Sequence, residues 1–256
     1  MSIVKEMQAG KLKVQVFDSR KSMGEASAKD VSAKIRELLS NKSEINMIFA
    51  AAPSQDDFLA ALRNDKSIQW ERINAFHMDE YIGLDPEAPQ GFGNFLRDRL
   101  FGKVHFKSVN YLNGNAKSID AECERYTALL KKNPTDIVCM GIGENGHIAF
   151  NDPHVAFFND PKMVKSVELD EKCRNQQVND GCFESFSKVP THALTLTIPA
   201  LVASTYVYCI VPAKTKADAV YKTVTGEITE KCPASILKNH QEAILYTETD
   251  SARLIL

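Results

Sequence analysis

The 256-residue chain has no long apolar run, no long run of one charge and no C-x-x-C cysteine pair. It lacks both a stretch of about 18 apolar residues and an N-terminal secretory region, so we expect neither a membrane span nor a membrane partner. A net charge of -2 without a basic cluster argues against nucleic acid as a partner. The six cysteines are scattered, which argues against a disulfide framework or a zinc site. We expect a cytoplasmic protein without a metal.

Strand-like and helix-like segments alternate along most of the chain. The apolar spacing predicts strands at 13–17, 46–52, 73–78, 109–112, 136–140, 194–198, 206–211 and 243–246, and helices at 24–41, around 58–62, and at 94–101, 118–132 and 214–223. Such alternation predicts an α/β fold with a mostly parallel sheet and helices on both faces. We expect a single domain over 1–256. Its least regular segment, 151–192, is a candidate lid over an active site.

The stretch from Met140 to Pro153 reads Met-Gly-Ile-Gly-Glu-Asn-Gly-His-Ile-Ala-Phe-Asn-Asp-Pro. It follows a predicted buried strand and contains three glycines before one imidazole, His147, with the carboxylate of Asp152 five residues later. Glycines let backbone N–H groups approach a ligand closely. An imidazole in such a loop favours acid–base chemistry.

Polar side chains also follow three other predicted strands. Ser54 and Gln55 follow 46–52, Asp79 and Glu80 follow 73–78, and Lys216 follows 206–211. In open α/β sheets, ligands bind at the carboxyl ends of the strands. These positions would therefore bring a hydroxyl and a cation suited to an anion together with a carboxylate and an imidazole suited to proton transfer.

Each of these side chains also has a purely structural interpretation. Ser54 could only cap a helix N-terminus, although that terminus would itself attract an anion. Asp79 could belong to a solvated acidic pair, Lys216 could lie on the surface, and His147 could be a hydrogen-bonded structural histidine. The convergence of all four at strand ends is what favours a functional site.

Three segments resemble the glucosamine-6-phosphate deaminase (isomerase) family: Phe76-His77-Met78-Asp79-Glu80-Tyr81-Ile82-Gly83-Leu84, Leu112-Asn113-Gly114-Asn115-Ala116, and 141–153. The similarity in spacing extends over nearly the whole chain. The resemblance implies a Rossmann-like fold, no cofactor, and conversion of an amino-sugar 6-phosphate to a ketose 6-phosphate with release of ammonia.

The resemblance also implies roles for individual residues. His147, oriented by Asp152, would move protons during opening of the sugar ring, and Asp79 would carry a proton between C1 and C2. Lys216 matches the phosphate lysine of the family, and Gly143 and Gly146 belong to its substrate loop. Base and carbon acid must come within hydrogen-bond reach for such a transfer.

The chain departs from the family pattern at several of these positions. Asn145 stands where the family has an acidic residue, and Asp152 stands where glutamate is usual. The phosphate loop with two glycines and a threonine is Ala52-Pro53-Ser54, followed by Gln55, and Pro53 lacks one backbone donor. Gln177 aligns with the phosphate arginine, so a bidentate guanidinium is missing there. Arg174, three residues earlier, is a candidate replacement.

The leading functional hypothesis is isomerisation and deamination of an amino-hexose 6-phosphate, with the gluco and galacto substrates both open. One alternative is a 6-phosphogluconolactonase-type hydrolase, although lactone hydrolysis needs no carbon-acid base and leaves Asp79 unexplained. The other is a non-catalytic sugar-phosphate-binding protein. Regulated members of the family are oligomeric, so a homo-oligomer is among the expected states.

Overall fold

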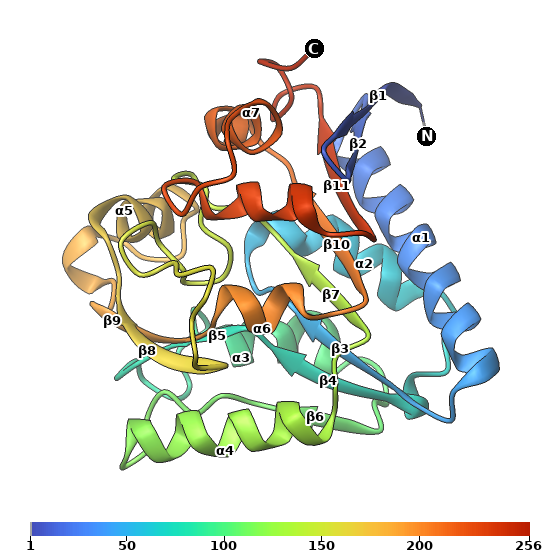
Figure 1. Ribbon diagram of the computed structural model, residues 1–256. Helices are drawn as coiled ribbons and strands as arrows, with labels where there is room; N and C mark the ends of the chain where they lie inside the picture. The colour runs from blue at the N-terminus through green and yellow to red at the C-terminus, as the bar shows by residue number, and fades with distance from the viewer. Residues whose placement is uncertain (1) are drawn as a thin grey trace.

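The strand-like segments assemble into one central sheet of eight strands in the order β1-β2-β11-β10-β7-β3-β4-β6 (Figure 1). The structure is a computed structural model and describes residues 2–256. The strands are β1 (Ile3–Ala9), β2 (Leu12–Phe17), β3 (Ile45–Phe49), β4 (Ile73–His77), β6 (Ser108–Asn110), β7 (Ile137–Met140), β10 (Tyr206–Val211) and β11 (Ala243–Glu248). Strand β1 pairs antiparallel with β2, and every other pair is parallel. The α/β prediction with a mostly parallel sheet is confirmed.

Helices cover both faces of this sheet and bury two separate apolar cores. The helices are α1 (Arg20–Asn41), α2 (Asp56–Asn64), α3 (Phe92–Leu96), α4 (Ile119–Lys132), α5 (Glu171–Asn179), α6 (Ile198–Val202) and α7 (Ala217–Thr225). One core gathers side chains of α1, α2 and α3, and the other gathers side chains of α4, α6 and α7. Strand β3 contributes side chains to both cores: Met47 and Phe49 belong to the first and Ile48 to the second, because successive side chains of a strand point to opposite faces.

A second, smaller sheet was not expected. Strands β5 (Asp79–Tyr81), β9 (His192–Leu196) and β8 (Val164–Glu168) form an antiparallel sheet in the order β5-β9-β8. The apolar pattern of 194–198 predicts a strand but does not reveal which strand it pairs with. In Figure 1 this sheet lies with α5 beside the main sheet. The candidate lid segment 151–192 therefore contributes β8 and α5, and β9 begins at its end.

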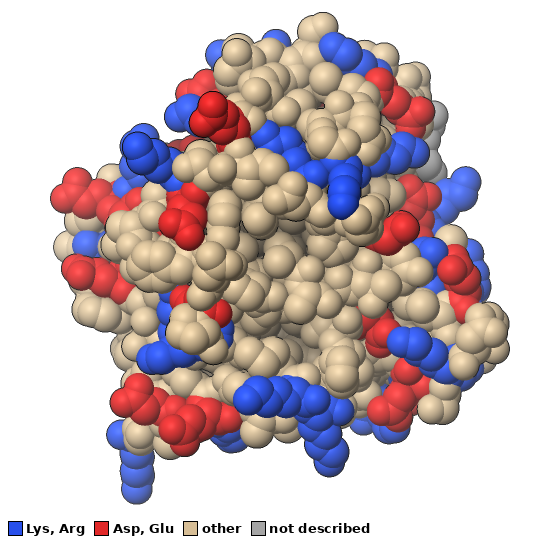
Figure 2. Space-filling view, viewed as in Figure 1, with Lys and Arg blue, Asp and Glu red and all other residues tan. Residues whose placement is uncertain are grey.

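Other differences lie at the ends of elements. Strand β1 was missed, although Gly10, with φ of +59°, makes the turn into β2. The predicted helix 94–101 is a short α3 continued by a π-helical turn, Arg97–Phe101. Within residues 2–256, none of the helices has the length and apolar character needed to cross a bilayer. Figure 2 shows positive and negative side chains interspersed around one face, with mostly uncharged residues in its centre.

Candidate active site

One pocket collects residues from the carboxyl ends of β3, β4, β7 and β10, where the sequence placed the site. Asp79 and His147 both line it, so one cavity gathers the carboxylate and the imidazole. Of the other predicted site residues, this pocket is lined by Ser54, Gln55, Gly143, Gln177 and Lys216. Asn145, Gly146, Asp152 and Arg174 do not line it. The walls also include Phe92, Phe150 and Gln176, which carried no signal in the sequence.

The imidazole of His147 is held from behind by buried polar groups. Its Nδ1 lies 3.0 Å from Oδ1 of Asp152, which is fully buried. Burial pushes the pKa of Asp152 upward, but the contacts with His147 and Asn145 hold it below its usual range. Asn145 donates from Nδ2 to Asp152 Oδ1 at 2.9 Å and accepts the His147 backbone N–H at 3.0 Å. The shorter aspartate thus reaches the imidazole directly, and Asn145 supports the pair without lining the pocket.

The two glycines predicted to contact substrate serve the loop itself. A Cβ at Gly143 would lie 2.1 Å from the His147 ring, so only glycine lets the imidazole pack there. Gly146 has a φ of +88°, and its Cβ would lie 2.8 Å from the Cys232 sulfur. The Gly143 N–H donates to the His147 carbonyl, and the Gly146 N–H donates to the Gly143 carbonyl, both at 2.9 Å. Both amides already donate within the loop, and Gly143 also lines the pocket.

Asp79 begins β5, two residues beyond the end of β4, and is buried at 6% exposure. Burial raises the pKa of its carboxyl well above the usual range, and the neighbouring charge of Glu80 adds to this. A carboxyl with a raised pKa is a stronger base once ionised. Alternation along β5 turns Glu80 to the opposite side, where it accepts N–H groups of Tyr81, Phe92 and Gly93.

A residue that sequence reasoning left without a role, His77, holds Asp79 in place. Its Nε2 accepts the Leu112 N–H at 2.9 Å, so Nδ1 carries the hydrogen and donates to the Asp79 carbonyl at 2.9 Å. His77 is fully buried and does not line the pocket, and burial lowers its pKa to about 4. The only sequence signal was its position two residues before Asp79 on a predicted strand.

The same pocket also carries groups suited to an anion. Lys216 is 4% exposed, and burial lowers its pKa, while the charges of Asp180 and Glu144 oppose that shift. Among the described residues lining this pocket, Lys216 has the only permanent positive charge. Ala213, with φ of +85°, shapes the turn that leads to it, a conformation costly for a residue with a Cβ. Gln177, in the place of the family arginine, also lines this pocket, with 6% exposure.

Ser54 and Gln55 stand in a short 3-10 turn before α2. Ser54 does not cap α2; its hydroxyl accepts a hydrogen bond from Gln55 Nε2 at 3.2 Å. Gln55 also donates to the Ile210 carbonyl at 3.0 Å, and its Oε1 is buried without a partner among residues 2–256. The first turn of α2 carries Asp56 and Asp57, each paired with an arginine, so this helix end is less attractive to an anion than its position suggests.

Arg174 does not replace the missing arginine. Its guanidinium donates to the carbonyls of Phe186 and Val189 at 2.9 and 2.8 Å and stacks on the Phe186 ring. It therefore braces the segment after α5 and does not face the pocket. The helical period explains the difference, because residues three apart on one helix, such as Arg174 and Gln177, share a face only approximately.

Two groups of side chains able to ligate a metal lie behind the pocket. One is His147, Asp152 and Cys173, and the other is Asp152, His154 and Asp170. Asp152 belongs to both, and its oxygens already accept hydrogen bonds from Asn145 and from the Asp170 N–H. The carboxylate that the two groups share is therefore already engaged by hydrogen bonds.

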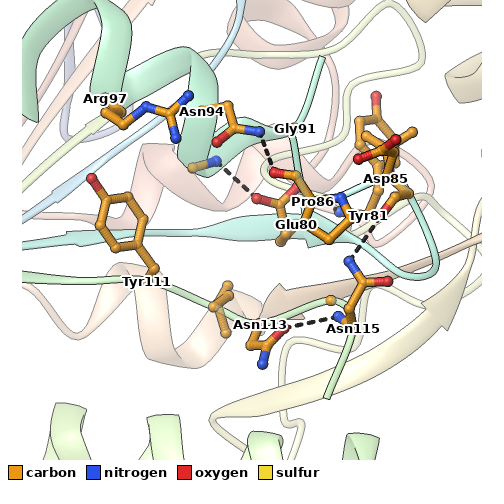
Figure 3. Close-up of a pocket in the computed structure, with 14 residues that line it drawn as sticks. Glu80, Tyr81, Asp85, Pro86, Gly91, Asn94, Arg97, Tyr111, Asn113 and Asn115 are labelled. Atoms are coloured by element: carbon orange, nitrogen blue, oxygen red, sulfur yellow. Dashed lines mark hydrogen bonds between the residues drawn. The ribbon is translucent and has the colours of Figure 1, made fainter. Parts of the chain in front are cut away.

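A larger cavity of about 230 Å³ opens on the other side of β5. Figure 3 shows Glu80 among its lining residues, with Arg97 and Tyr111 to one side and Asn115 on the opposite side. Neither Asp79 nor His147 lines it. Its size alone therefore does not identify it as the reaction site, because no proton-transfer pair faces it.

Comparison with known proteins supports the family resemblance over most of the chain. A family model described as glucosamine-6-phosphate isomerases/6-phosphogluconolactonase matches residues 18–246. A glucosamine-6-phosphate deaminase of Bacillus cereus is 34% identical over 220 residues, 86% of this chain and 82% of that protein. The corresponding protein of Bacillus cytotoxicus is 30% identical over 243 residues, covering 95% and 89%.

Solved structures agree with the fold. A monomeric glucosamine-6-phosphate deaminase superposes with a TM-score of 0.85 at 29% identity, covering 97% of this chain and all of that chain. A 6-phosphogluconolactonase of Thermotoga maritima has a TM-score of 0.74 at 19% identity, covering 92% and 98%, which shows the shared fold alone. The chain belongs to the glucosamine-6-phosphate isomerase/6-phosphogluconolactonase family.

Proposed function

We propose that the protein isomerises and deaminates an amino-hexose 6-phosphate, with glucosamine 6-phosphate, or its galactosamine equivalent, as substrate and fructose 6-phosphate, or tagatose 6-phosphate, plus ammonia as products. The observation that carries this proposal is that Asp79 and His147 line one pocket. A carboxylate with a raised pKa in the same pocket as an acid–base imidazole suits proton transfer at two neighbouring carbons of an open sugar. The deaminase names of the relatives at 34% and 30% identity support the same reaction.

His147 would serve the opening of the sugar ring. Opening requires a proton to leave the C1 hydroxyl and another to reach the ring oxygen, and an imidazole can accept one and donate the other. The carboxylate of Asp152 lies 3.0 Å from Nδ1, which leaves Nε2 for the substrate. The close fit of the ring over Gly143 restricts its rotation further.

Asp79 would then move a proton from C2 to C1 of the open-chain sugar. The electron pair left at C2 forms the C1–C2 double bond of the enolamine, while the C1 carbonyl oxygen takes a proton given up by the substrate ammonium. Return of the C2 proton to C1 then gives an iminium at C2. Water adds to this iminium, and ammonia leaves. The anchoring of the Asp79 backbone by His77 keeps the carboxylate at a fixed place during both transfers.

Lys216 is the group that we assign to the substrate phosphate, assisted by the Ser54 hydroxyl and the Gln177 amide. A phosphate would place a further counter-charge directly against the buried ammonium, beyond those of Asp180 and Glu144. Binding energy from this remote group would orient the reacting carbons. With one lysine and neutral donors, the site holds phosphate with less charge than a lysine and an arginine would.

Helix α5 is proposed to act as the lid. Gln176 and Gln177 of α5 form part of the pocket wall. Outward movement of this helix would widen the pocket for substrate entry, and its return over the sugar would exclude water.

Purified protein should release ammonia and form a ketose 6-phosphate from glucosamine 6-phosphate or galactosamine 6-phosphate. The same preparation should not hydrolyse 6-phosphogluconolactone, which needs no base for a carbon acid. Rapid lactone hydrolysis without ammonia release would favour the lactonase alternative. Binding of the sugar phosphate, measured calorimetrically, without turnover of either substrate would instead favour the non-catalytic binder.

A further inference from the structure

The carboxylate of Asp170 joins the pocket-lining helix α5 to the loop that carries His147. Asp170 is the N-cap of α5, and its Oδ1 accepts the Cys173 N–H at 2.6 Å. Its other oxygen, Oδ2, accepts a hydrogen bond from Asn145 Nδ2 at 2.9 Å. One side chain thus satisfies a helix terminus and an amide of the active-site loop at the same time.

The same Asn145 amide nitrogen also donates to Asp152 Oδ1, again at 2.9 Å. Both of its hydrogens are therefore committed, one to each carboxylate. Because the amide is planar, an acceptor at Asp170 fixes the direction in which the second N–H points. That direction sets how Asp152 is held, and Asp152 in turn lies 3.0 Å from the imidazole of His147.

Two further contacts attach α5 to this region independently of the Asp170 side chain. The Asp170 backbone N–H donates to Asp152 Oδ2 at 3.2 Å. Gln176 Oε1 accepts the Glu144 N–H at 2.8 Å. Removing only the Asp170 carboxylate therefore leaves α5 docked, and separates the orientation of Asn145 from the attachment of the helix.

We propose that Asp170 is a positioning residue for the reaction: through Asn145 it orients the Asp152–His147 pair, and it ties that orientation to the closed position of α5. This inference rests on the proposed function, since it assigns Asp170 to the proton transfers of His147. Asp170 touches no substrate in this arrangement. Its effect on the reaction passes through the contacts from Asp170 to Asn145, from Asn145 to Asp152, and from Asp152 to His147.

The test begins with Asp170→Ser, because serine keeps the N-cap but is too short to reach Asn145. We expect kcat to fall about 10- to 100-fold with KM changed less than about threefold, as for other residues that orient a reacting group from behind. Asp170→Asn serves as a second variant, since it preserves the size of the side chain while its amide cannot satisfy both neighbours. A rise in KM with kcat unchanged would mean that Asp170 only docks α5, and would overturn the proposal.

Ser118→Ala provides a matched control for loss of a helix cap. Ser118 caps α4 by accepting the Ala121 N–H at 3.2 Å, and it does not line the pocket. This variant should lose stability without losing kcat. If it lowers kcat as much as Asp170→Ser does, general loosening of the fold explains both results and the proposal fails.

The decisive experiment repeats Asp170→Ser in an Asn145→Ala background. If Asp170 acts through Asn145, the second substitution should lower the remaining kcat less than about twofold, a clear departure from additivity. A further 10- to 100-fold loss of kcat would show that Asp170 affects the reaction without Asn145, and would reject the proposal.

Urea unfolding without substrate tests the contact between Asp170 and Asn145. The four proteins compared are the wild type, Asp170→Ser, Asn145→Ala and the double variant. Non-additive changes in the free energy of unfolding confirm that positions 145 and 170 are coupled. If the two positions are coupled but the wild-type protein is inactive on amino-sugar phosphates, the proposed function is rejected and the contact is still confirmed. Additive stabilities in an active enzyme would instead reject the inference and leave the proposed function standing.

Discussion

His77 donates its Nδ1 hydrogen to the backbone carbonyl of Asp79 at 2.9 Å, and its other ring nitrogen accepts the Leu112 N–H. The imidazole therefore links the end of β4, the start of β5 and the segment after β6. Only the neutral ring can do this, because the protonated form has no lone pair for the Leu112 N–H. The carboxylate proposed as the carbon-acid base is thus fixed by a histidine that never meets the substrate.

Folding stability should depend on His77 below neutral pH. Its pKa falls from 6.5 to about 4 in the folded state, so the unfolded chain binds the proton more readily. The contribution of His77 is therefore present above pH 6.5 and is lost as the pH falls towards 4. We expect a loss of about 3 kcal/mol over that range, measured by urea unfolding at several pH values. The neutral His77→Gln variant should show a smaller fall, and equal pH dependence in both proteins would refute this.

Substitution of Asp79 should separate stability from activity. Asp79→Asn should lower kcat roughly 10²- to 10⁴-fold with substrate affinity nearly unchanged, because the base is lost and the shape is kept. The raised pKa means that the favourable, protonated form of Asp79 is present at low pH and is lost as the pH rises. The variant should therefore gain stability over wild type more at pH 7 than at pH 4. An equal gain in stability at pH 4 and pH 7, or a normal kcat, would contradict the assignment of Asp79 as a buried base.

Binding of the substrate phosphate should depend on Lys216, and an arginine in place of Gln177 should strengthen it. Lys216→Met keeps the buried stem and should raise KM for an amino-sugar 6-phosphate while leaving binding of the unphosphorylated sugar unchanged. Gln177→Arg should strengthen phosphate binding about tenfold, because a charged hydrogen bond contributes roughly 1.5–3 kcal/mol. Equal effects of Lys216→Met on both sugars, measured side by side, would remove Lys216 from the phosphate site.

Gly143 should tolerate no side chain. In Gly143→Ala the new Cβ would fall 2.1 Å from the His147 ring, so the imidazole must move. We expect kcat to fall about 100-fold, because displacements near 1 Å at a reacting group have effects of this size. Gly181→Ala is a control for strain without a clash: Gly181 has a φ of +73°, and its Cβ would meet nothing within 4 Å, whereas Gly143 does not have a positive φ. Similar losses of kcat in the two variants would point to general destabilisation and away from the imidazole.

The sequence alone determined the α/β class, the family, and the main members of the pocket. Strand ends of a parallel sheet converge, so Asp79, His147 and Lys216 could be placed together before any coordinates were known. Motifs such as Phe76–Leu84 and 141–153 carried the resemblance because the chemistry depends on those side chains in that order.

Only the tertiary structure decided which residues contact and orient these pocket side chains. Sequence spacing could not show that Arg174 binds carbonyls of its own segment, or that the glycine amides are consumed inside the loop. Nor could it show that β5 leaves the main sheet to pair with β9, or that Asp170 meets Asn145 across 25 residues. Hydrogen-bond partners and strand pairing depend on the approach of distant segments, whereas periodicity and local motifs report only on neighbours along the chain.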